Sequence, residues 1–208
     1  MKIKYCGLRR EEDITYANET LPDYIGFVFA PTRRQVSVKQ AEVLKKRLKP
    51  EIKAVGVFVN ETVEDVAEIA NRGIIDLIQL HGQENADYIT RLRKILFEPK
   101  PIIKAVRVQS LQDIEDGDKL DVDYLLLDKY DPKQLGGTGE KFDWSLIQKI
   151  RKPFFLAGGI TEDNLIEAME LNPYGIDVSS GIETEGMKDY DKMKMMMNLF
   201  RQELKLKT

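Results

Sequence analysis

Short apolar runs alternate along the whole chain with stretches in which apolar residues recur at helical spacing. Most of these runs are continuously apolar, which is typical of parallel strands buried on both faces. Eight have the length of a strand: Ile3–Cys6, Tyr24–Phe29, Ala54–Val59, Ile74–Leu80, Ile102–Val106, Tyr124–Leu127, Phe154–Ala157 and Gly175–Val178. The pattern therefore predicts eight successive units of a strand followed by a helix.

The stretches between the runs carry helix signals. One expected helix places four apolar residues on a single face, at Val63, Val66, Ala67 and Ala70. The last segment repeats this spacing with Met193, Met196, Met197, Phe200 and Leu204, which favours a core-facing helix over an interface. Three helix starts are marked by a hydroxyl residue with Gln or Asp three positions later, at Ser37, Thr62 and Ser110.

Eight strand-and-helix units can close into a barrel or spread into an open doubly wound sheet. The barrel is favoured because the count is eight and no Gly-x-Gly-x-x-Gly fingerprint follows the first strand. A chain of 208 residues is near the lower size limit of such barrels, so the loops must be short. We expect residues 1–208 to form one α/β domain, a (βα)8 TIM barrel.

Composition narrows the classes of partner. The chain has 32 Lys and Arg against 35 Asp and Glu, a net charge of −3, and therefore no basic footprint for nucleic acid or anionic membranes. Its apolar runs are far shorter than the roughly 20 residues of a membrane helix, and no signal peptide is visible. With one cysteine and one histidine, the chain can form neither an internal disulfide nor a zinc cluster. We expect a cytoplasmic protein without a metal or cofactor.

Residues able to exchange protons follow two of the expected strands, at the end where barrel enzymes place their active sites. Cys6 ends the first strand, and modest electropositive surroundings would leave its thiol partly ionised at neutral pH. A lone cysteine is more often a buried hydrophobe, but the position at the rim favours catalysis. Asp128 follows an apolar run, where desolvation can raise the pKa of a carboxyl into the range of a general acid. The two groups could flank a substrate.

Other polar residues on the same rim suit a small anionic substrate. Arg34 could bind a carboxylate through two hydrogen bonds, although a loop arginine is usually only solvated. His81 could line the pocket or be structural, and Asp177, near the end of the eighth strand, is expected to help bind the substrate. Two turns are rich in glycine and serine: Gly158 and Gly159, then Ser179, Ser180 and Gly181. Such turns let backbone N–H groups approach a phosphate. Either turn alone could merely permit a tight bend; together they predict phosphate binding.

The connection after the sixth strand is long for a compact barrel and contains Gly136, Gly137, Thr138 and Gly139. Long connections in compact domains are usually functional, and glycines would let this one close over a ligand as a lid. A flexible surface loop is the alternative.

Eight motifs spread over essentially the whole chain together resemble the phosphoribosylanthranilate isomerases of tryptophan biosynthesis. They are Lys4–Gly7, Gly26–Phe29, Val55–Asn60, Ile78–Gly82, Leu126–Asp128, Gly136–Gly139 with Phe142–Trp144, Ala157–Ile160 and Asp177–Glu183. The resemblance implies that Cys6 and Asp128 are the catalytic residues and that Arg34 contacts the anthranilate carboxylate. The shorter loop before this arginine leaves Arg33 as an alternative. Tyr5 replaces the usual isoleucine, and strand alternation should turn it away from the side that Cys6 faces.

The implied reaction is an Amadori rearrangement of N-(5-phosphoribosyl)anthranilate to 1-(2-carboxyphenylamino)-1-deoxyribulose 5-phosphate, by acid–base catalysis and without a cofactor. A ribulose-phosphate epimerase would need several metal-binding histidines, and an indoleglycerol-phosphate synthase would need a catalytic lysine on the rim. Lys104 and Lys129 lie near the rim but in no such pattern. A barrel that only binds a phosphorylated ligand remains an alternative from another class. A monomer is slightly favoured over a homodimer.

Overall fold

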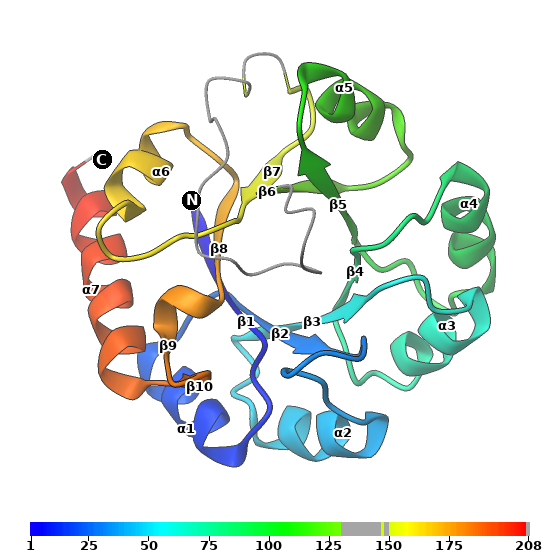
Figure 1. Cartoon of the computed structure of the whole chain (residues 1–208). Coiled ribbons are helices and arrows are strands. Elements are labelled where there is room, and N and C mark those ends of the chain that lie inside the picture. The colour runs from blue at the N-terminus through cyan, green and yellow to red at the C-terminus, as the bar shows by residue number, and fades with distance from the viewer. Residues whose placement is uncertain (130–146, 148–149, 207–208) are drawn as a thin grey trace.

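Eight parallel strands close into a barrel in the computed structural model, which describes residues 1–129, 147 and 150–206. The strands follow one another around the barrel in chain order, with helices outside them (Figure 1). The strands are β1 (Lys2–Cys6), β2 (Tyr24–Val28), β3 (Lys53–Phe58), β4 (Leu77–Leu80), β5 (Ile102–Val108), β6 (Tyr124–Lys129), β7 (Phe154–Leu156) and β8 (Gly175–Val178). The predicted single-domain barrel is confirmed.

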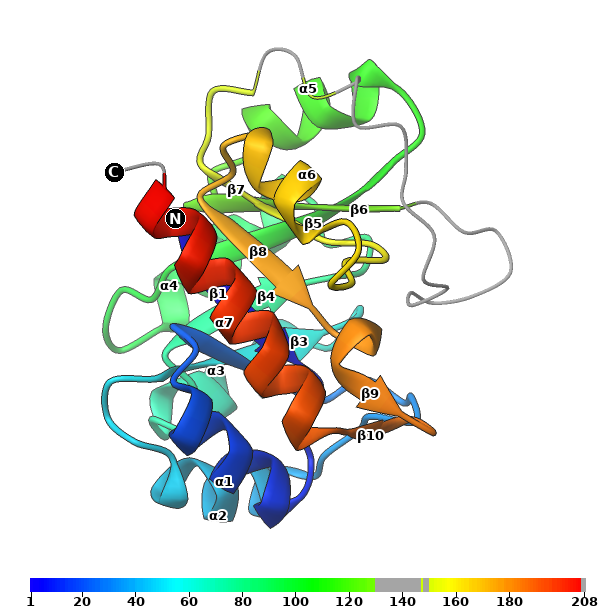
Figure 2. The same cartoon turned by 90° about the vertical axis from the view of Figure 1, so that its left-hand side faces the viewer.

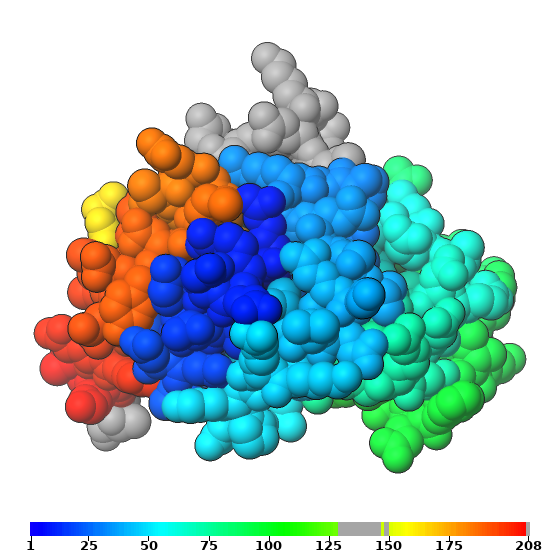
Figure 3. Space-filling view, turned by 90° about the horizontal axis from the view of Figure 1, so that it is seen from below, coloured from blue at the N-terminus to red at the C-terminus, as the bar shows by residue number. Residues whose placement is uncertain are grey.

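The helices lie around the outside of the barrel (Figure 1). On the surface seen from below, residues from the start of the chain (blue) lie beside residues from its last part (orange to red) (Figure 3). The helices are α1 (Glu11–Thr20), α2 (Val38–Arg47), α3 (Val63–Asn71), α4 (Ala86–Ile95), α5 (Leu111–Lys119), α6 (Leu165–Glu170) and α7 (Tyr190–Leu206). After β8 come a 3-10 turn, η2 (Ser180–Ile182), and a hairpin of β9 (Glu183–Thr184) and β10 (Met187–Lys188). No helix among the described residues is both long and apolar enough to cross a membrane.

The predicted helix signals have the expected structural roles. The backbone N–H groups of Gln40 and Asp65 donate to the hydroxyls of Ser37 and Thr62 at 3.1 Å each, so α2 and α3 begin directly after these residues. Helix α7 crosses the outside of the barrel beside α1 (Figure 2). It buries the apolar face predicted for it, with Met193, Met196, Met197 and Phe200 inside and Leu204 partly buried.

One strand starts later than its apolar run suggested. Ile74 and Ile75 are buried, but β4 begins only at Leu77. The intervening Asp76 accepts a hydrogen bond from Ala54 N at 2.7 Å, which fixes the chain in a turn just before the strand. An apolar run records burial and not backbone conformation, so it overestimated this strand.

Alternation along each strand separates an outer layer from the barrel interior. In β6, Leu125 and Leu127 pack into the large core beneath the helices, whereas Leu126 belongs to the interior cluster. The same alternation turns Asp128 into the interior. Aromatic rings fill the end of the barrel at which the strands begin, where Tyr24, Tyr124 and Tyr174 surround Phe155. The opposite end is left to the polar residues.

Candidate active site

Cys6 shares the interior face of β1 with a buried lysine two residues earlier. The ammonium of Lys4 has no exposed surface and donates to Oδ1 of Asp177, on β8, at 2.9 Å. Tyr5 points the other way, and its hydroxyl donates to the carbonyl of Met193 in α7 at 2.7 Å, as alternation predicted. The sequence can therefore vary at position 5 without altering the interior face that carries Cys6.

The thiol of Cys6 is buried against the neighbouring strand. A Cβ atom at Gly26, on β2, would lie 2.7 Å from Sγ of Cys6, so this glycine makes room for the thiol. Burial raises the pKa of Cys6, and the positive charge of Lys4 only partly offsets this. The expected electropositive neighbour is present, but the effect of desolvation on the pKa of the thiol outweighs it.

Asp128 lies beside the single histidine. Its Oδ2 is 3.3 Å from Nε2 of His81, which follows β4. The other ring nitrogen, Nδ1, is 3.0 Å from Nε2 of Gln79, on the same face of the same strand. Which of these two contacts the ring donates depends on the tautomer of His81. His81 thus contacts the predicted catalytic acid.

Arg34 lies over the start of the β1–α1 loop. A Cβ atom at Gly7 would lie 2.4 Å from Cδ of Arg34, so the arginine stem crosses the residue directly after Cys6, and Gly7 has a φ of +84°. The guanidinium is bound by Glu183, with 2.7 Å from Nε to Oε1 and 2.8 Å from Nη2 to Oε2. Arg33 also reaches Glu183, but its side chain is 58% exposed against 13% for Arg34. Of the two arginines, Arg34 is the one held at the interior.

The two predicted phosphate turns pack directly on each other. Gly158 and Gly159 have φ angles of +86° and +73°, conformations that side chains rarely adopt. A Cβ atom at Gly181 would lie only 2.1 Å from the carbonyl oxygen of Ile160. The glycines are thus required for one compact surface in which both turns meet.

Two details of this surface differ from the expectation. The first turn was expected to lead into a helix, but α6 begins only at Leu165, because the side chain of Asn164 donates to the carbonyl of Gly159 at 2.8 Å and closes a turn first. The hydroxyl of Ser179 donates to the carbonyl of Cys6 at 3.2 Å and so ties this turn to β1. Ser180 begins the 3-10 turn η2.

Four residues that contact the predicted site residues were not identified from the sequence: Lys4, Gln79, Glu183 and Lys188. Strand alternation could have identified Lys4 and Gln79, since they share a face with Cys6 and His81. The other two are cross-strand partners in the β9–β10 hairpin, whose turn consists of Glu185 and Gly186 with φ angles of +51° and +77°. A residue followed by glycine between two short strands is a hairpin signal that could have paired Glu183 with Lys188.

Some candidates lie elsewhere or outside the described residues. Lys104 faces away from the barrel interior, and its ammonium donates to Glu84 at 3.0 Å and to the carbonyl of Gly82 at 2.7 Å. It is therefore not a lysine of the barrel mouth. The expected lid, Gly136–Gly139, and the side chain of Lys129 lie outside the described residues. Within the described part of the chain, no group of three His, Cys, Asp or Glu side chains could hold a metal ion.

The closed barrel, with groups able to exchange protons on its interior face, defines an acid–base enzyme of the (βα)8-barrel class. The family model described as N-(5'-phosphoribosyl)anthranilate (PRA) isomerase matches residues 3–199. The chain therefore belongs to the phosphoribosylanthranilate isomerase family and has the activity of that family, an isomerisation in tryptophan biosynthesis.

Individual relatives are similar to this chain in sequence and in structure over nearly its full length. The N-(5'-phosphoribosyl)anthranilate isomerase of Thermoanaerobacter sp. (strain X514) is 45% identical over 204 residues, covering 97% of this chain and 98% of the relative. A crystal structure of phosphoribosylanthranilate isomerase with reduced 1-(o-carboxyphenylamino)-1-deoxyribulose 5-phosphate is 31% identical, with a TM-score of 0.82 over 97% of this chain and 99% of that one. Monomers generated from the dimeric enzyme of Thermotoga maritima are 32% identical, with a TM-score of 0.83 and the same coverage. The family thus includes dimeric members.

Proposed function

We propose that Asp128 and Cys6 carry out the proton transfers of the isomerisation. Asp128, as a carboxylic acid, protonates the furanose ring oxygen of N-(5-phosphoribosyl)anthranilate. The bond from C1′ to that oxygen breaks, and the lone pair of the anthranilate nitrogen forms a protonated Schiff base. The substrate supplies its own electron sink, so the step needs no cofactor.

The thiolate of Cys6 then removes the proton at C2′. The electrons of the broken C–H bond form the C1′–C2′ double bond, and the iminium nitrogen becomes an amine. The resulting enolamine gives up its enol proton, takes a proton at C1′ and becomes the ketone product. Atoms and charge balance, and no oxidation occurs. Positioned acids and bases of this kind typically contribute about 10²–10⁴-fold each.

The observation that carries the proposal is the placement of both groups on the interior face of one barrel. Cys6 ends β1, beside the ammonium of Lys4, and Asp128 lies near the end of β6, beside the imidazole of His81. Parallel strands all end at the same side of a barrel, so the two side chains face the same opening. A thiol and a carboxyl on opposite sides of a small substrate can exchange protons with different atoms of it.

Two further groups suit the two anionic ends of this substrate. Arg34 would receive the anthranilate carboxylate; its side-chain stem crosses Gly7, the residue that follows Cys6, which supports this role. The surface formed by Gly158, Gly159 and Gly181, with Ser180 beside it, presents backbone N–H groups for the phosphate. Asp177 acts through its ion pair with Lys4, near the thiol. We assign the phosphorylated substrate to this chain on these grounds.

A fluorescence assay that follows the loss of phosphoribosylanthranilate tests the assignment. Cys6→Ser and Asp128→Asn are each expected to remove most turnover, while inhibition by inorganic phosphate survives. Asp121→Asn is the matched control, because this carboxylate is 82% exposed in the turn that precedes β6. Rates near that of the wild type in both site variants would reject the proposed roles.

Two coarser features complete the proposal. We expect the enzyme to act in the cytoplasm, because a phosphorylated sugar intermediate does not diffuse across a membrane and must be consumed where it is made. We also expect a monomer, in slight preference to a homodimer, since the methionine face of α7 is filled by the core. Sedimentation of the full chain distinguishes the two states.

A further inference from the structure

The carboxylate of Glu183 forms ion pairs with three cationic side chains at the edge of the barrel mouth. Besides the two hydrogen bonds from Arg34, its Oε1 accepts from Nζ of Lys188 at 2.7 Å and its Oε2 accepts from Nη2 of Arg33 at 3.0 Å. The carboxylate is buried, and Lys188 is only 4% exposed. Burial acts to raise the pKa of Glu183, but the bonds and charges of Arg34 and Lys188 outweigh it and hold the pKa at about 2. The carboxylate is therefore ionised throughout the working range of pH.

The bonds to Glu183 occupy one edge of the Arg34 guanidinium. A guanidinium has five N–H groups in a rigid plane, and Glu183 takes one on Nε and one on Nη2. The N–H groups of Nη1 and the second N–H of Nη2 donate to no partner among the described residues. Together they form an edge to which a carboxylate can bind with two parallel hydrogen bonds.

The charges of the cluster also favour one more anion. Arg33, Arg34 and Lys188 supply three positive charges, and Glu183 supplies one negative charge, which leaves 3 − 1 = +2. The nearby pair of Lys4 and Asp177 is neutral in sum. An anionic group that binds at the open edge of Arg34 therefore reduces an excess of positive charge. The attraction of the three cationic side chains outweighs the repulsion from Glu183.

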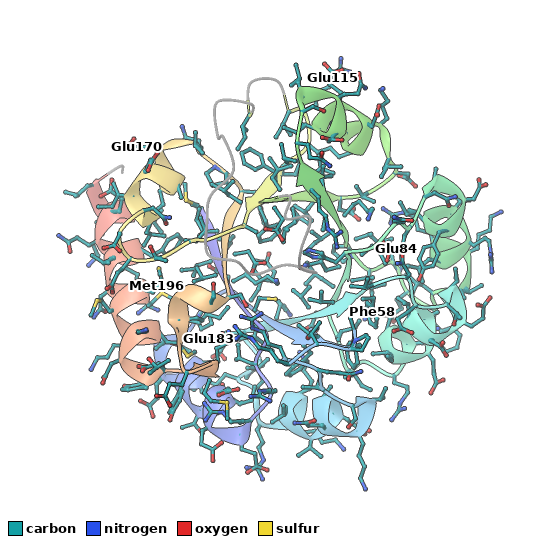
Figure 4. The ribbon with its side chains drawn as sticks, in the orientation of Figure 1. Phe58, Glu84, Glu115, Glu170, Glu183 and Met196 are labelled. Atoms are coloured by element: carbon teal, nitrogen blue, oxygen red, sulfur yellow. The ribbon has the colours of Figure 1, made fainter. Side chains whose placement is uncertain are left out.

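The hairpin that carries Glu183 is fixed to the surface that we propose as the phosphate site. Lys188 donates a second hydrogen bond, to the carbonyl of Ser179 at 2.9 Å, so it joins the hairpin to the residue before η2. Figure 4 shows Glu183 between the η2–β9 segment and the first strands of the barrel. The guanidinium of Arg34 is thus held from one side by Glu183, and the side-chain stem of Arg34 packs on Gly7.

From these contacts we infer that Glu183 is a positioning residue, which aims the open edge of Arg34 at the carboxylate of the substrate. The inference rests on the proposed role of Arg34 and deepens it. Glu183 does not touch the reacting atoms. Its effect should therefore depend on whether the ligand carries a carboxylate, whereas a purely structural role would affect every ligand equally.

The test compares two stable ligands with and without this carboxylate. One is the reduced product analogue that bears the 2-carboxyphenylamino group, and the other is the same compound with an unsubstituted phenyl ring. Dissociation constants are measured by titration calorimetry on the full chain. Glu183→Gln should weaken the carboxylate ligand roughly tenfold or more, the scale of a hydrogen bond to a charged group, and change the phenyl ligand by less than about twofold. In turnover, KM should rise more than kcat falls.

Three controls make the result specific. Glu185→Gln alters an exposed carboxylate in the turn of the same hairpin and should leave both ligands unchanged. Glu183→Asp retains the charge but is too short to meet Nε and Nη2 in the same place, so it should show the same selective loss if Glu183→Gln does not fold. Arg34→Met combined with Glu183→Gln should be no weaker than Arg34→Met alone.

The outcomes separate the two proposals. If Arg34→Met weakens the two ligands equally, the proposed role of Arg34 is wrong, and the role of Glu183 with it. If Arg34→Met selectively weakens the carboxylate ligand but both Glu183 variants weaken the two ligands equally, or weaken neither, the positioning role of Glu183 is wrong. Inhibition by inorganic phosphate should remain that of the wild type, and a parallel loss there would also overturn the inference.

Discussion

The imidazole of His81 lies between Gln79 and Asp128, with its Nε2 atom 3.3 Å from Oδ2 of the carboxyl and its Nδ1 atom 3.0 Å from the Gln79 amide. This relationship joins the end of β4 to β6 across the intervening strand. The contact lies on the carboxyl that we propose as the catalytic acid. Its loss should therefore affect the rate of ring opening.

His81→Asn removes the contact to Asp128 while keeping a polar side chain. We expect kcat to fall roughly 10- to 100-fold, the equivalent of about 1.5–3 kcal/mol for a hydrogen bond to a charged group. The acidic limb of the pH–rate profile should move, because the environment of Asp128 changes. Stopped-flow fluorescence across pH 5–9 measures both quantities. An unchanged profile with a lower rate would mean that His81 shapes the pocket without acting on Asp128.

The raised pKa of Cys6 predicts where activity is lost in alkaline solution. The active free enzyme combines an ionised thiol with a protonated carboxyl, and burial keeps the pKa of the thiol above its ordinary value of 9.0. Because a thiol loses its proton at higher pH than a carboxyl, kcat/KM, which reports the free enzyme, should be bell-shaped, with its alkaline limb beyond pH 9. The residual activity of Cys6→Ser should lack this limb. A decline that begins below pH 8 in the wild type would contradict the assignment of the thiol as the base.

The buried pair of Lys4 and Asp177 should be sensitive to the loss of one partner. Lys4→Met leaves the Asp177 carboxylate without its cation at a site where it is 8% exposed, and we expect a cost of about 3–5 kcal/mol in the free energy of unfolding. The double variant Lys4→Met/Asp177→Leu removes the unpaired charge and should recover part of this loss. Urea unfolding followed by circular dichroism measures all three proteins. Equal stabilities of the single and double variants would show that the charge pair is not the cause.

Gly181→Ala tests the contact between the two phosphate turns. The added methyl group would meet the carbonyl oxygen of Ile160 at 2.1 Å, so one turn must move away from the other. We expect a rise in KM and in the inhibition constant of inorganic phosphate of roughly tenfold, with kcat less affected. Gly73→Ala is the control, since Gly73 has a positive φ of +73° but no atom within 4 Å of an added Cβ. It should lower stability without changing phosphate affinity.

Glu183 predicts a pH dependence of stability. Its pKa in the folded state is about 2, below the ordinary value of 4.5, so the ionised carboxylate stabilises the fold above pH 4.5 and this contribution is lost as the pH falls towards 2. The difference in unfolding free energy between the wild type and Glu183→Gln should therefore shrink over this range. Urea titrations at pH 6, 4 and 3 measure it. A difference that stays constant with pH would exclude the ionised carboxylate as its source.

The sequence by itself determined the barrel and the strands that carry its proton-exchanging groups. Continuous apolar runs and helical spacing are local properties, so they predicted eight strand-and-helix units, and alternation correctly placed Tyr5 on the outside and Cys6 on the inside of β1. The same local reasoning located Asp128 at the end of its run. The Gly158–Gly159 turn also followed from sequence, because glycine is the residue that most readily adopts positive φ angles.

Only the tertiary structure decided which distant residues meet. Glu183 and Arg34 are separated by 149 positions, and Lys4 and Asp177 by 173, so no periodicity in the sequence relates them. The net direction of the Cys6 pKa likewise depends on how completely folding removes water from the thiol, against the charge of Lys4. Closure of the barrel brings its first and last strands together. This closure creates both the Lys4–Asp177 ion pair and the contact between Arg34 and Glu183.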